Sequence, residues 1–242
     1  MESLETELDR ARDLDEAALA DAIETIGFEC TRCGACCKGY EPEETSTVDD
    51  GVDAVDSTAD REPHTATVFP DEVRTLQDAG DYDWRDVARP MPYGLSEGDD
   101  GLEGETFEWA LQTDSCGDCT FYTESDDGTG ACQVHDDRPL ICRTYPFSVD
   151  LGGTSQPMGE AVDEAGMVRA HECEGLGRDI SRDEAEELAA ALKTRAIREI
   201  EEAIGVRDNY QPAAVDREAA GGVVVHDSEG AKRADGRPVD EQ

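Results

Sequence analysis

The chain has 242 residues, enough for one domain with tails, and 60 acidic against 21 basic side chains give a formal net charge of −39. This charge argues against nucleic acid as a partner, because phosphate binding requires basic patches that the sequence lacks. No apolar run approaches the ~20 residues that a membrane-spanning helix needs, and residues 1–10 are acidic, unlike a secretory leader. We therefore expect a cytoplasmic protein with no membrane or nucleic-acid partner.

Acidic residues are spread along the whole chain and are not gathered in one tail. Such a distribution suits a surface that stays hydrated in molar salt, where ions screen its self-repulsion. A specific acidic face for a cationic partner is the alternative. The chain-wide bias favours the first interpretation, a halophilic protein.

Residues 1–27 predict an N-terminal helix. Gly27 follows as the stop. The apolar side chains recur at helical spacing: Leu4, Leu8, Ala11, Leu14, Ala18, Ala22 and Ile26.

Residues 41–62, rich in Asp, Glu, Ser and Thr, predict a solvated acidic insert. Residues 70–79 predict a short helix with Pro70 in its first turn, and residues 96–106 predict a second acidic insert, an exposed loop.

The middle of the chain predicts short strands. Residues 107–111 form the first of these. Residues 119–123 and 131–135 predict two further strands, joined by a turn that contains Gly128. This hairpin would place Cys119 and Cys132 on neighbouring strands, close enough to share a metal ion.

The last third of the chain predicts two helices and a tail. Residues 138–143 form a short helix, because Pro139 suits a first turn. Residues 179–205 form a C-terminal helix that starts at a capping box of Ser181 and Glu184 and stops at Gly205. Residues 206–242 are polar and glycine-rich and predict a disordered tail, in which the single apolar run, 223–225, is either disordered or a loosely attached strand.

Nine cysteines carry the clearest chemical signal in the chain. Four lie within eight residues, and five follow downstream: Cys30, Cys33, Cys36 and Cys37, then Cys116, Cys119, Cys132, Cys142 and Cys173. In a reducing cytoplasm, thiols at this density indicate metal ligation and not disulfides. The C-x2-C-x2-C spacing, with Gly34 letting the backbone wrap a ligand, suits zinc or an iron–sulfur cluster.

The order of these motifs resembles the YkgJ family of cysteine cluster proteins, whose shared domain is described as zinc- or iron-chelating. The resemblance rests on Cys30-x2-Cys33-Gly34-x-Cys36-Cys37, Cys119, Cys132, Arg138-Pro139-x2-Cys142-Arg143-x-Tyr145-Pro146-Phe147 and Cys173-x-Gly175-Leu-Gly177. It implies a metal-binding domain over residues 28–178, here in an acidic, haloarchaeal-type member. The ligands that it implies are Cys30, Cys33, Cys36, Cys37, Cys119, Cys132, Cys142 and Cys173. Arg138 and Arg143 flank Cys142 and are expected to neutralise a thiolate-rich site.

Eight thiols are four plus four, which allows two zinc sites, one cluster and one zinc, or two clusters. Neighbouring side chains diverge on an extended backbone, so Cys36 and Cys37 can serve different sites. Cys116 forms a C-x2-C pair with Cys119 and can replace one of the eight ligands or remain a free thiol. The spacing slightly favours a four-iron, four-sulfide cluster over zinc.

The fold expected is α+β: a small loop-rich domain stapled by metal, with a short hairpin, between N- and C-terminal helices. The function expected first is a cytoplasmic metal-binding protein with a structural or electron-carrying centre, whose redox or protein partner the sequence does not identify. The second is an enzyme, because the resemblance extends to iron–sulfur oxidoreductases and to proteins similar to flagellin lysine N-methylase. Metal storage or delivery is a third, and would need exchangeable binding.

Overall fold

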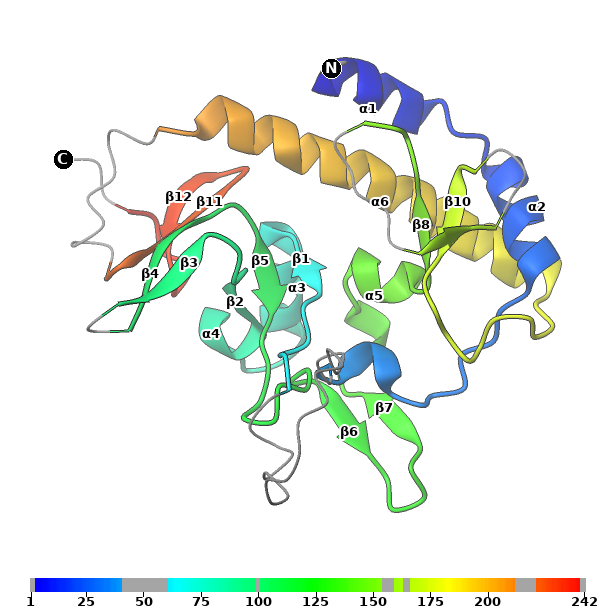
Figure 1. Ribbon diagram of the computed structural model, residues 1–242, viewed down its shortest axis with the longest axis horizontal. Coiled ribbons are helices and arrows are strands. Elements are labelled where there is room, and N and C mark those ends of the chain that lie inside the picture. Colours follow the sequence, from blue (N-terminus) through cyan, green and yellow to red (C-terminus); the bar gives the residue numbers. More distant parts are fainter. Residues whose placement is uncertain are drawn as a thin grey trace, which may run out of the picture.

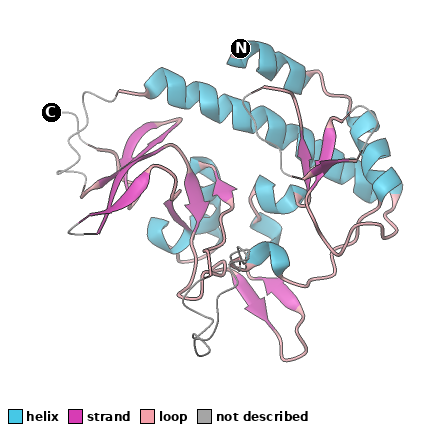
Figure 2. Ribbon diagram, viewed as in Figure 1, coloured by secondary structure: helices cyan, strands magenta, loops and turns pink. Residues whose placement is uncertain are grey.

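The computed structural model describes residues 3–40, 61–98, 101–153, 159–162, 166–211 and 221–239. Helices lie towards both ends of the chain and several small sheets lie in the middle (Figures 1 and 2). The fold is therefore mixed α+β, as expected from the sequence. Within the described ranges, no helix combines the length and the apolarity needed to cross a lipid bilayer.

Two helices occupy the segment in which the sequence predicted one helix over residues 1–27. They are α1 (Leu4–Arg12) and α2 (Glu16–Ile26). The interruption has a local cause, because the Asp15 carboxylate accepts hydrogen bonds from the first backbone amides of α2 and so caps a new helix. Gly27 ends α2 with a φ of 74°, in the role predicted for it.

The longest helix, α6 (Arg182–Asn209), runs across the top of Figure 1 and connects both sides of the molecule. The predicted capping box is confirmed, since Ser181 and Glu184 each accept a hydrogen bond from the other's backbone amide. The helix continues past the predicted stop at Gly205. A Cβ atom at Gly205 would lie 2.5 Å from the Cβ of Ser228, so this glycine serves close packing and not helix termination.

The first hydrophobic core, here called the helical core, lies between α1, α2, α6 and a three-stranded sheet. That sheet has the strand order β8 (Phe147–Val149), β10 (Val168–Ala170), β9 (Glu160–Ala161). The largest fully buried side chains of the helical core are Leu19, Ile23, Phe147, Val168, Leu192 and Ile200. Burying large apolar side chains of this kind stabilises a fold by roughly 1.5–3 kcal/mol each.

The second hydrophobic core, here called the sheet core, lies on the other side of the molecule. Its elements are the sheet β1 (Thr67–Val68), β5 (Trp109–Leu111), β2 (Ala88–Pro90), the helices α3 (Pro70–Ala79) and α4 (Trp84–Val87), and strand β11 (Val223–Asp227). Helix α3 has the bounds predicted from the sequence. The buried members of the sheet core include Val68, Val73, Leu76, Val87, Trp109 and Val225.

The prediction of disorder for residues 206–242 is wrong for the part that the structure describes, whereas the alternative of a strand at 223–225 agrees with it. Strands β11 (Val223–Asp227) and β12 (Gly230–Arg233) join β4 (Gly101–Thr106) and β3 (Leu95–Gly98) in a sheet of order β12-β11-β4-β3. The apolar run at the start of β11 is buried and pairs in parallel with β4, so hydrophobic burial overrides the polar composition around it. The insert predicted as a loop over 96–106 contributes most of β3 and β4, whereas residues 41–60 lie outside the described ranges.

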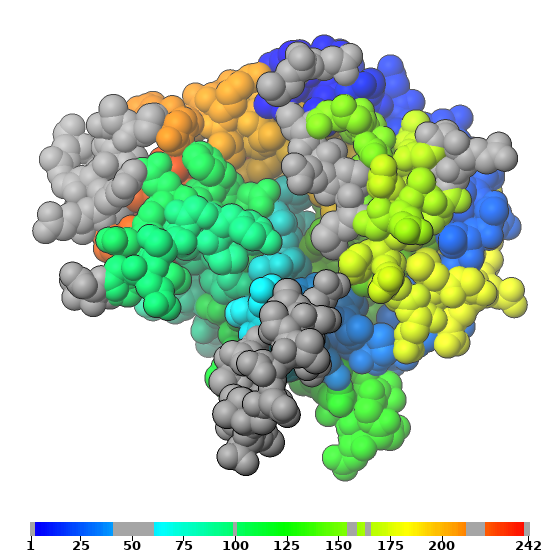
Figure 3. Space-filling model, in the orientation of Figure 1, coloured from blue at the N-terminus to red at the C-terminus, as the bar shows by residue number. Residues whose placement is uncertain are grey.

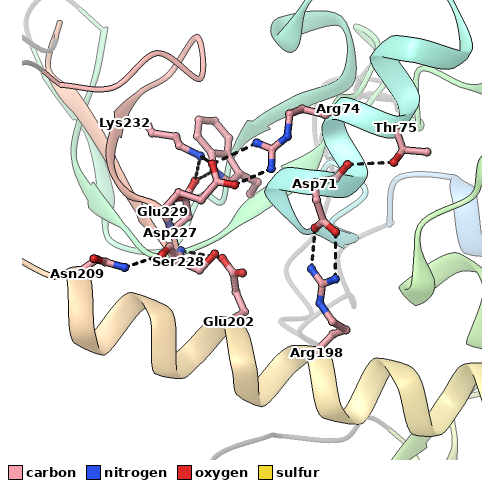
Figure 4. Close-up of polar contacts among 11 residues, drawn as sticks. Asp71, Arg74, Thr75, Arg198, Glu202, Asn209, Asp227, Ser228, Glu229 and Lys232 are labelled. Carbon is pink, nitrogen blue, oxygen red and sulfur yellow. Dashed lines mark hydrogen bonds and ion pairs between the residues drawn. The ribbon is translucent and has the colours of Figure 1, made fainter.

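Polar contacts tie this C-terminal hairpin to α6 and α3 (Figure 4). The Asn209 side chain donates to the Ser228 carbonyl at 2.7 Å, and the Ser228 amide donates to Glu202 at 2.9 Å. Arg74 of α3 pairs with Glu229 at 2.6 Å. These bonds hold the hairpin against the end of α6, so the segment is part of the folded body.

Candidate metal centre

The first cysteine segment lies where the two cores meet. Its 3₁₀ turn η1 (Ala35–Cys37) follows Gly34, whose φ of 78° is left-handed. A Cβ atom at this position would lie 2.1 Å from the Tyr122 hydroxyl. Glycine is therefore required twice here, for the backbone conformation and for the close approach of the hairpin.

The entry to this segment is paired with the segment that carries Cys173. Phe28 and Leu176 form an antiparallel bridge, and the Glu29 amide donates to the Gly175 carbonyl at 3.1 Å. Phe28 and Leu176 both pack against the helical core. This pairing brings Cys30 towards Cys173 although 143 positions separate them in the sequence.

The exit from the segment is paired with the second group of cysteines. The Cys119 amide donates to the Cys37 carbonyl at 2.8 Å. Beyond it, the hairpin β6 (Tyr122–Glu124) and β7 (Gly130–Cys132) sets Tyr122 opposite Cys132 and projects from the lower edge of the molecule (Figure 3). A hairpin is present, but its strands are shorter than the sequence suggested. Cys119 precedes β6 and bridges to Thr113, so that of the two cysteines predicted on the hairpin only Cys132 lies on one of its strands.

The fourth thiol of this side comes from α5 (Leu140–Thr144), which carries Cys142. Cys119 is buried in the sheet core, and Cys37, Cys132 and Cys142 pack against that core. Four thiols thus share one apolar environment, although they come from four separate segments.

Thiolate charges report which cysteines lie within electrostatic reach of one another. Burial raises the pKa of Cys173, and the nearby thiols of Cys33, Cys36 and Cys30 raise it further. Burial also raises the pKa of Cys142, with further contributions from Cys119, Cys36 and Cys132. Apart from Cys36, which influences both, the two sets have no common member.

Cys36 and Cys37 lie at the boundary between these sets, with their sulfur atoms 3.8 Å apart. The hydrogen bond from Cys37 lowers the pKa of Cys36 to about 7, and the positive charge of Arg138 also lowers it. The same hydrogen bond, together with burial and the charges of Cys36, Cys119 and Cys142, raises the pKa of Cys37. A thiolate at Cys36 is thus favoured near neutral pH, as a metal ligand requires.

All nine cysteines lie in the described part of the chain and carry free thiols. Their number and softness fit zinc or an iron–sulfur cluster. Among the described residues, however, no three side chains of Cys, His, Asp or Glu converge closely enough to hold a metal ion. Ligation would therefore require thiols to turn towards a common centre. Cys116 is exposed, on the turn that precedes Cys119.

The two predicted arginines lie beside the thiols. Arg138 donates from Nε to the His135 carbonyl at 3.0 Å, and its charge lowers the pKa of Cys36, Cys132 and Cys142. Arg143 follows Cys142 on α5. In its observed position, Arg138 therefore stabilises nearby thiolates. Arg143 does not lower the pKa of any cysteine whose pKa is shifted.

Two tyrosines near the thiols were not singled out from the sequence as site residues. Burial raises the pKa of Tyr145, and so do Cys173 and Cys36; Tyr40 is affected in the same way by burial, Cys36 and Cys37. Tyr145 donates its hydroxyl hydrogen to the Glu172 carbonyl at 3.0 Å. The available signal was its position in the Arg-x-Tyr-Pro-Phe motif, three residues after Cys142.

Replacing Gly34 by alanine is expected to destabilise this loop by about 1–3 kcal/mol, the usual cost of a strained backbone, plus the displacement of Tyr122. Gly128 provides a matched control, since its φ is also left-handed, at 82°, but no atom lies within 4 Å of an added Cβ. Thermal melts and metal content of Gly34→Ala and Gly128→Ala measure the difference. Equal stability of the two variants would contradict the tight contact with Tyr122.

Comparisons with known proteins give one family match. No curated protein and no solved structure matches the chain. A family model described as "Putative zinc- or iron-chelating domain" matches residues 29–174, which is more than half of the chain and spans the eight predicted ligands. The membership supports metal binding by the cysteines described above. The chain belongs to this CxxCxxCC family.

Proposed function

We propose that the protein binds metal at two adjacent sites of four cysteine thiolates each. The first site consists of Cys30, Cys33, Cys36 and Cys173, and the second of Cys37, Cys119, Cys132 and Cys142. The observation that carries this proposal is the division of the thiols into two sets, with Cys36 and Cys37 at their boundary. Cys116 remains outside both sets.

The two sites differ in ligand pattern, and we assign different metals to them. The first has C-x2-C-x2-C with one distant cysteine, the three-plus-one pattern typical of a four-iron, four-sulfide cluster. The second draws on a hairpin and a short helix, as structural zinc sites do. The cluster would supply one-electron chemistry when bound. The zinc site would supply folding free energy.

The centre would also join the two cores. The first set is attached to the helical core through the bridge between Phe28 and Leu176, and the second packs against the sheet core. Two metal sites sharing one short turn would hold these bodies together. A structural or electron-carrying role follows from this position.

Metal and acid-labile sulfide analysis of anaerobically purified protein tests the assignment, with the visible absorption spectrum of the same sample. We expect about four iron, four sulfide and one zinc per chain. Colourless protein with two zinc ions would keep the two sites but overturn the cluster. A single metal ion with no sulfide would overturn the two-site proposal.

Two matched variants separate the sites. Cys173→Ser should lose iron and colour but keep zinc, and Cys132→Ser should lose zinc but keep the cluster. Both substitutions remove one partly exposed thiol from the end of a ligand set, so their structural cost is comparable. Loss of the same metal in both variants would show that the eight thiols form one site.

We further infer that the protein works in a reducing, salt-rich cytoplasm, because nine free thiols and a net charge of −39 suit both conditions. Raising the salt concentration from about 0.01 M to 1 M shortens the screening length from about 30 Å to about 3 Å. The melting temperature should therefore rise with salt, by about 2–4 °C for each 1 kcal/mol of repulsion relieved. A melting temperature unchanged by salt, with sucrose as the uncharged comparison, would favour an acidic face for a cationic partner.

An enzymatic role of the iron–sulfur oxidoreductase or lysine N-methylase-like kind is the second candidate. One observation favours it: a cleft of about 480 Å³ adjoins Cys30, a proposed ligand of the first site. Substrate-dependent change in the spectrum of the metal-loaded protein would support this role. Metal centres that no small molecule perturbs would favour the structural role.

A further inference from the structure

The cleft beside Cys30 lies between the first cysteine segment, α5 and the first turns of α6. Its volume of about 480 Å³ is within the usual range of about 300–1,000 Å³ for small-molecule sites. Its lining is mostly polar, and Phe28, Leu188 and Ala191 contribute the apolar part. Arg138 and Arg143 line it from the side of α5.

Arg143 is unusual among the arginines of this acidic chain. Arg182, for example, pairs with Asp21, Glu24 and Glu186, as expected where carboxylates outnumber basic groups almost three to one. Within the described ranges, Arg143 makes no hydrogen bond and no ion pair, although four carboxylates line the same cleft. Its five guanidinium donors are therefore available to a ligand.

The side of the cleft formed by α6 and the residues before it carries the opposite charge. Asp179 and Glu187 line it there, and neither carboxylate has a hydrogen-bond or ion-pair partner among the described residues. Glu184, which also lines the cleft, is occupied by its capping contacts with Ser181. Cationic and anionic groups thus face the same space without meeting, since no nitrogen–oxygen distance between them is within 4.0 Å.

We propose that this cleft binds a small zwitterion of the α-amino-acid class. Its carboxylate would accept paired hydrogen bonds from Arg143, a geometry for which the planar guanidinium is suited. Its ammonium group would bind Glu187, and its apolar side chain would lie along Leu188 and Phe28. A simple anion fits less well, because four carboxylates and two arginines give the lining a net charge of −2. A simple cation would leave Arg143 unused.

The proposal places a small molecule beside the first metal site. It rests on the proposed function only in assuming that Cys30, next to the cleft, is a metal ligand. A molecule in the cleft would lie against Cys30, so its binding should also alter the absorption of a cluster at this site. The two groups that carry the proposed charge contacts, Arg143 and Glu187, are not among the proposed metal ligands. Binding and metal content can therefore be measured separately.

The test is calorimetric titration of the metal-loaded full chain with three matched probes. L-Leucine carries both charges, isopentylamine lacks the carboxylate, and 4-methylpentanoate lacks the ammonium group. Leucine should bind, and each of the other two should bind at least about tenfold more weakly, since a hydrogen bond to a charged group contributes about 1.5–3 kcal/mol. Amine binding as tight as leucine binding would overturn the proposal in favour of general attraction of cations.

Variants locate the site. Arg143→Gln and Glu187→Gln should each weaken leucine binding at least about tenfold, while Arg237→Gln, whose side chain is 80% exposed away from the cleft lining, should leave it unchanged. Glu187 lies on α6 outside the cysteine segments, so its variant remains informative if Arg143→Gln disturbs Cys142. Metal content is measured on every sample. Missing metal with intact binding would refute the proposed function alone, and intact metal without leucine binding would refute the zwitterion site alone.

Discussion

Replacing Cys37 by serine is expected to destabilise the whole protein and to remove metal from the second site. Cys37 lies at the junction of the two cores, where its carbonyl accepts the amide hydrogen of Cys119 and its sulfur contacts Cys36. Structural zinc contributes an apparent free energy of about 10–16 kcal/mol in zinc-finger peptides, against a typical net protein stability of about 5–15 kcal/mol. Weakening such a site therefore affects a large fraction of the total stability. Thermal unfolding and zinc analysis of the same sample measure both effects.

Cys116→Ser is the matched control for Cys37→Ser. Cys116 is exposed and precedes Cys119 by three positions, so the substitution Cys116→Ser removes a thiol from the same neighbourhood. Its melting temperature and metal content should equal those of the parent protein. Metal loss in Cys116→Ser would place this thiol among the ligands, and an unchanged Cys37→Ser would remove Cys37 from them.

Local patterns in the sequence were sufficient to predict several elements. The capping box of Ser181 and Glu184 acts within one helical turn, and Pro70 fixes the start of α3 in the same way. The hairpin of β6 and β7 follows from its turn residues, which lie between short β-forming segments. Each of these signals depends on residues a few positions apart, so the sequence alone contains the whole cause.

The elements that were missed depend on distant partners. Strand β11 pairs in parallel with β4, more than 100 positions earlier, and neither strand has an alternating apolar pattern. Gly205 looks like a helix stop until the nearby Ser228 shows that it permits close packing. Composition predicted disorder for β11 and β12 because the residues that cover them are not their sequence neighbours.

The candidate site shows the same limit. The spacing of Cys30, Cys33 and Cys36 predicts a shared ligand set, because the loop is short and contains a glycine. The fourth member needs the pairing of Phe28 with Leu176, which no local pattern reveals. The expected divergence of Cys36 from Cys37 suggested two sites from the sequence, although in the 3₁₀ turn that contains them their sulfur atoms lie 3.8 Å apart. The proposed assignment of distant thiols to each site rests on the fold.

Replacing Asp227 by alanine should cost about 3–5 kcal/mol of stability, the usual effect of breaking a buried ion pair. Asp227 is 1% exposed, accepts the indole hydrogen of Trp109 at 2.8 Å and pairs with Lys232 at 2.7 Å (Figure 4). Its loss would leave Trp109 without an acceptor and Lys232 with Glu229 as its remaining carboxylate partner. The free energy of unfolding, measured by urea titration at fixed salt concentration, gives the effect directly.

Asp235→Ala provides the comparison within the same C-terminal segment. Asp235 is 33% exposed, lies 3.7 Å from the Arg237 guanidinium and accepts the Arg237 amide hydrogen at 3.1 Å, so its removal should change stability by no more than about 1.5 kcal/mol. Both variants lose one carboxylate, and their effects on net charge are therefore equal. If Asp227→Ala were as stable as Asp235→Ala, the hairpin of β11 and β12 would not be part of the folded body. The polar composition of the tail would then have been the better guide, whereas a large difference establishes that buried charge and parallel pairing anchor this end of the chain.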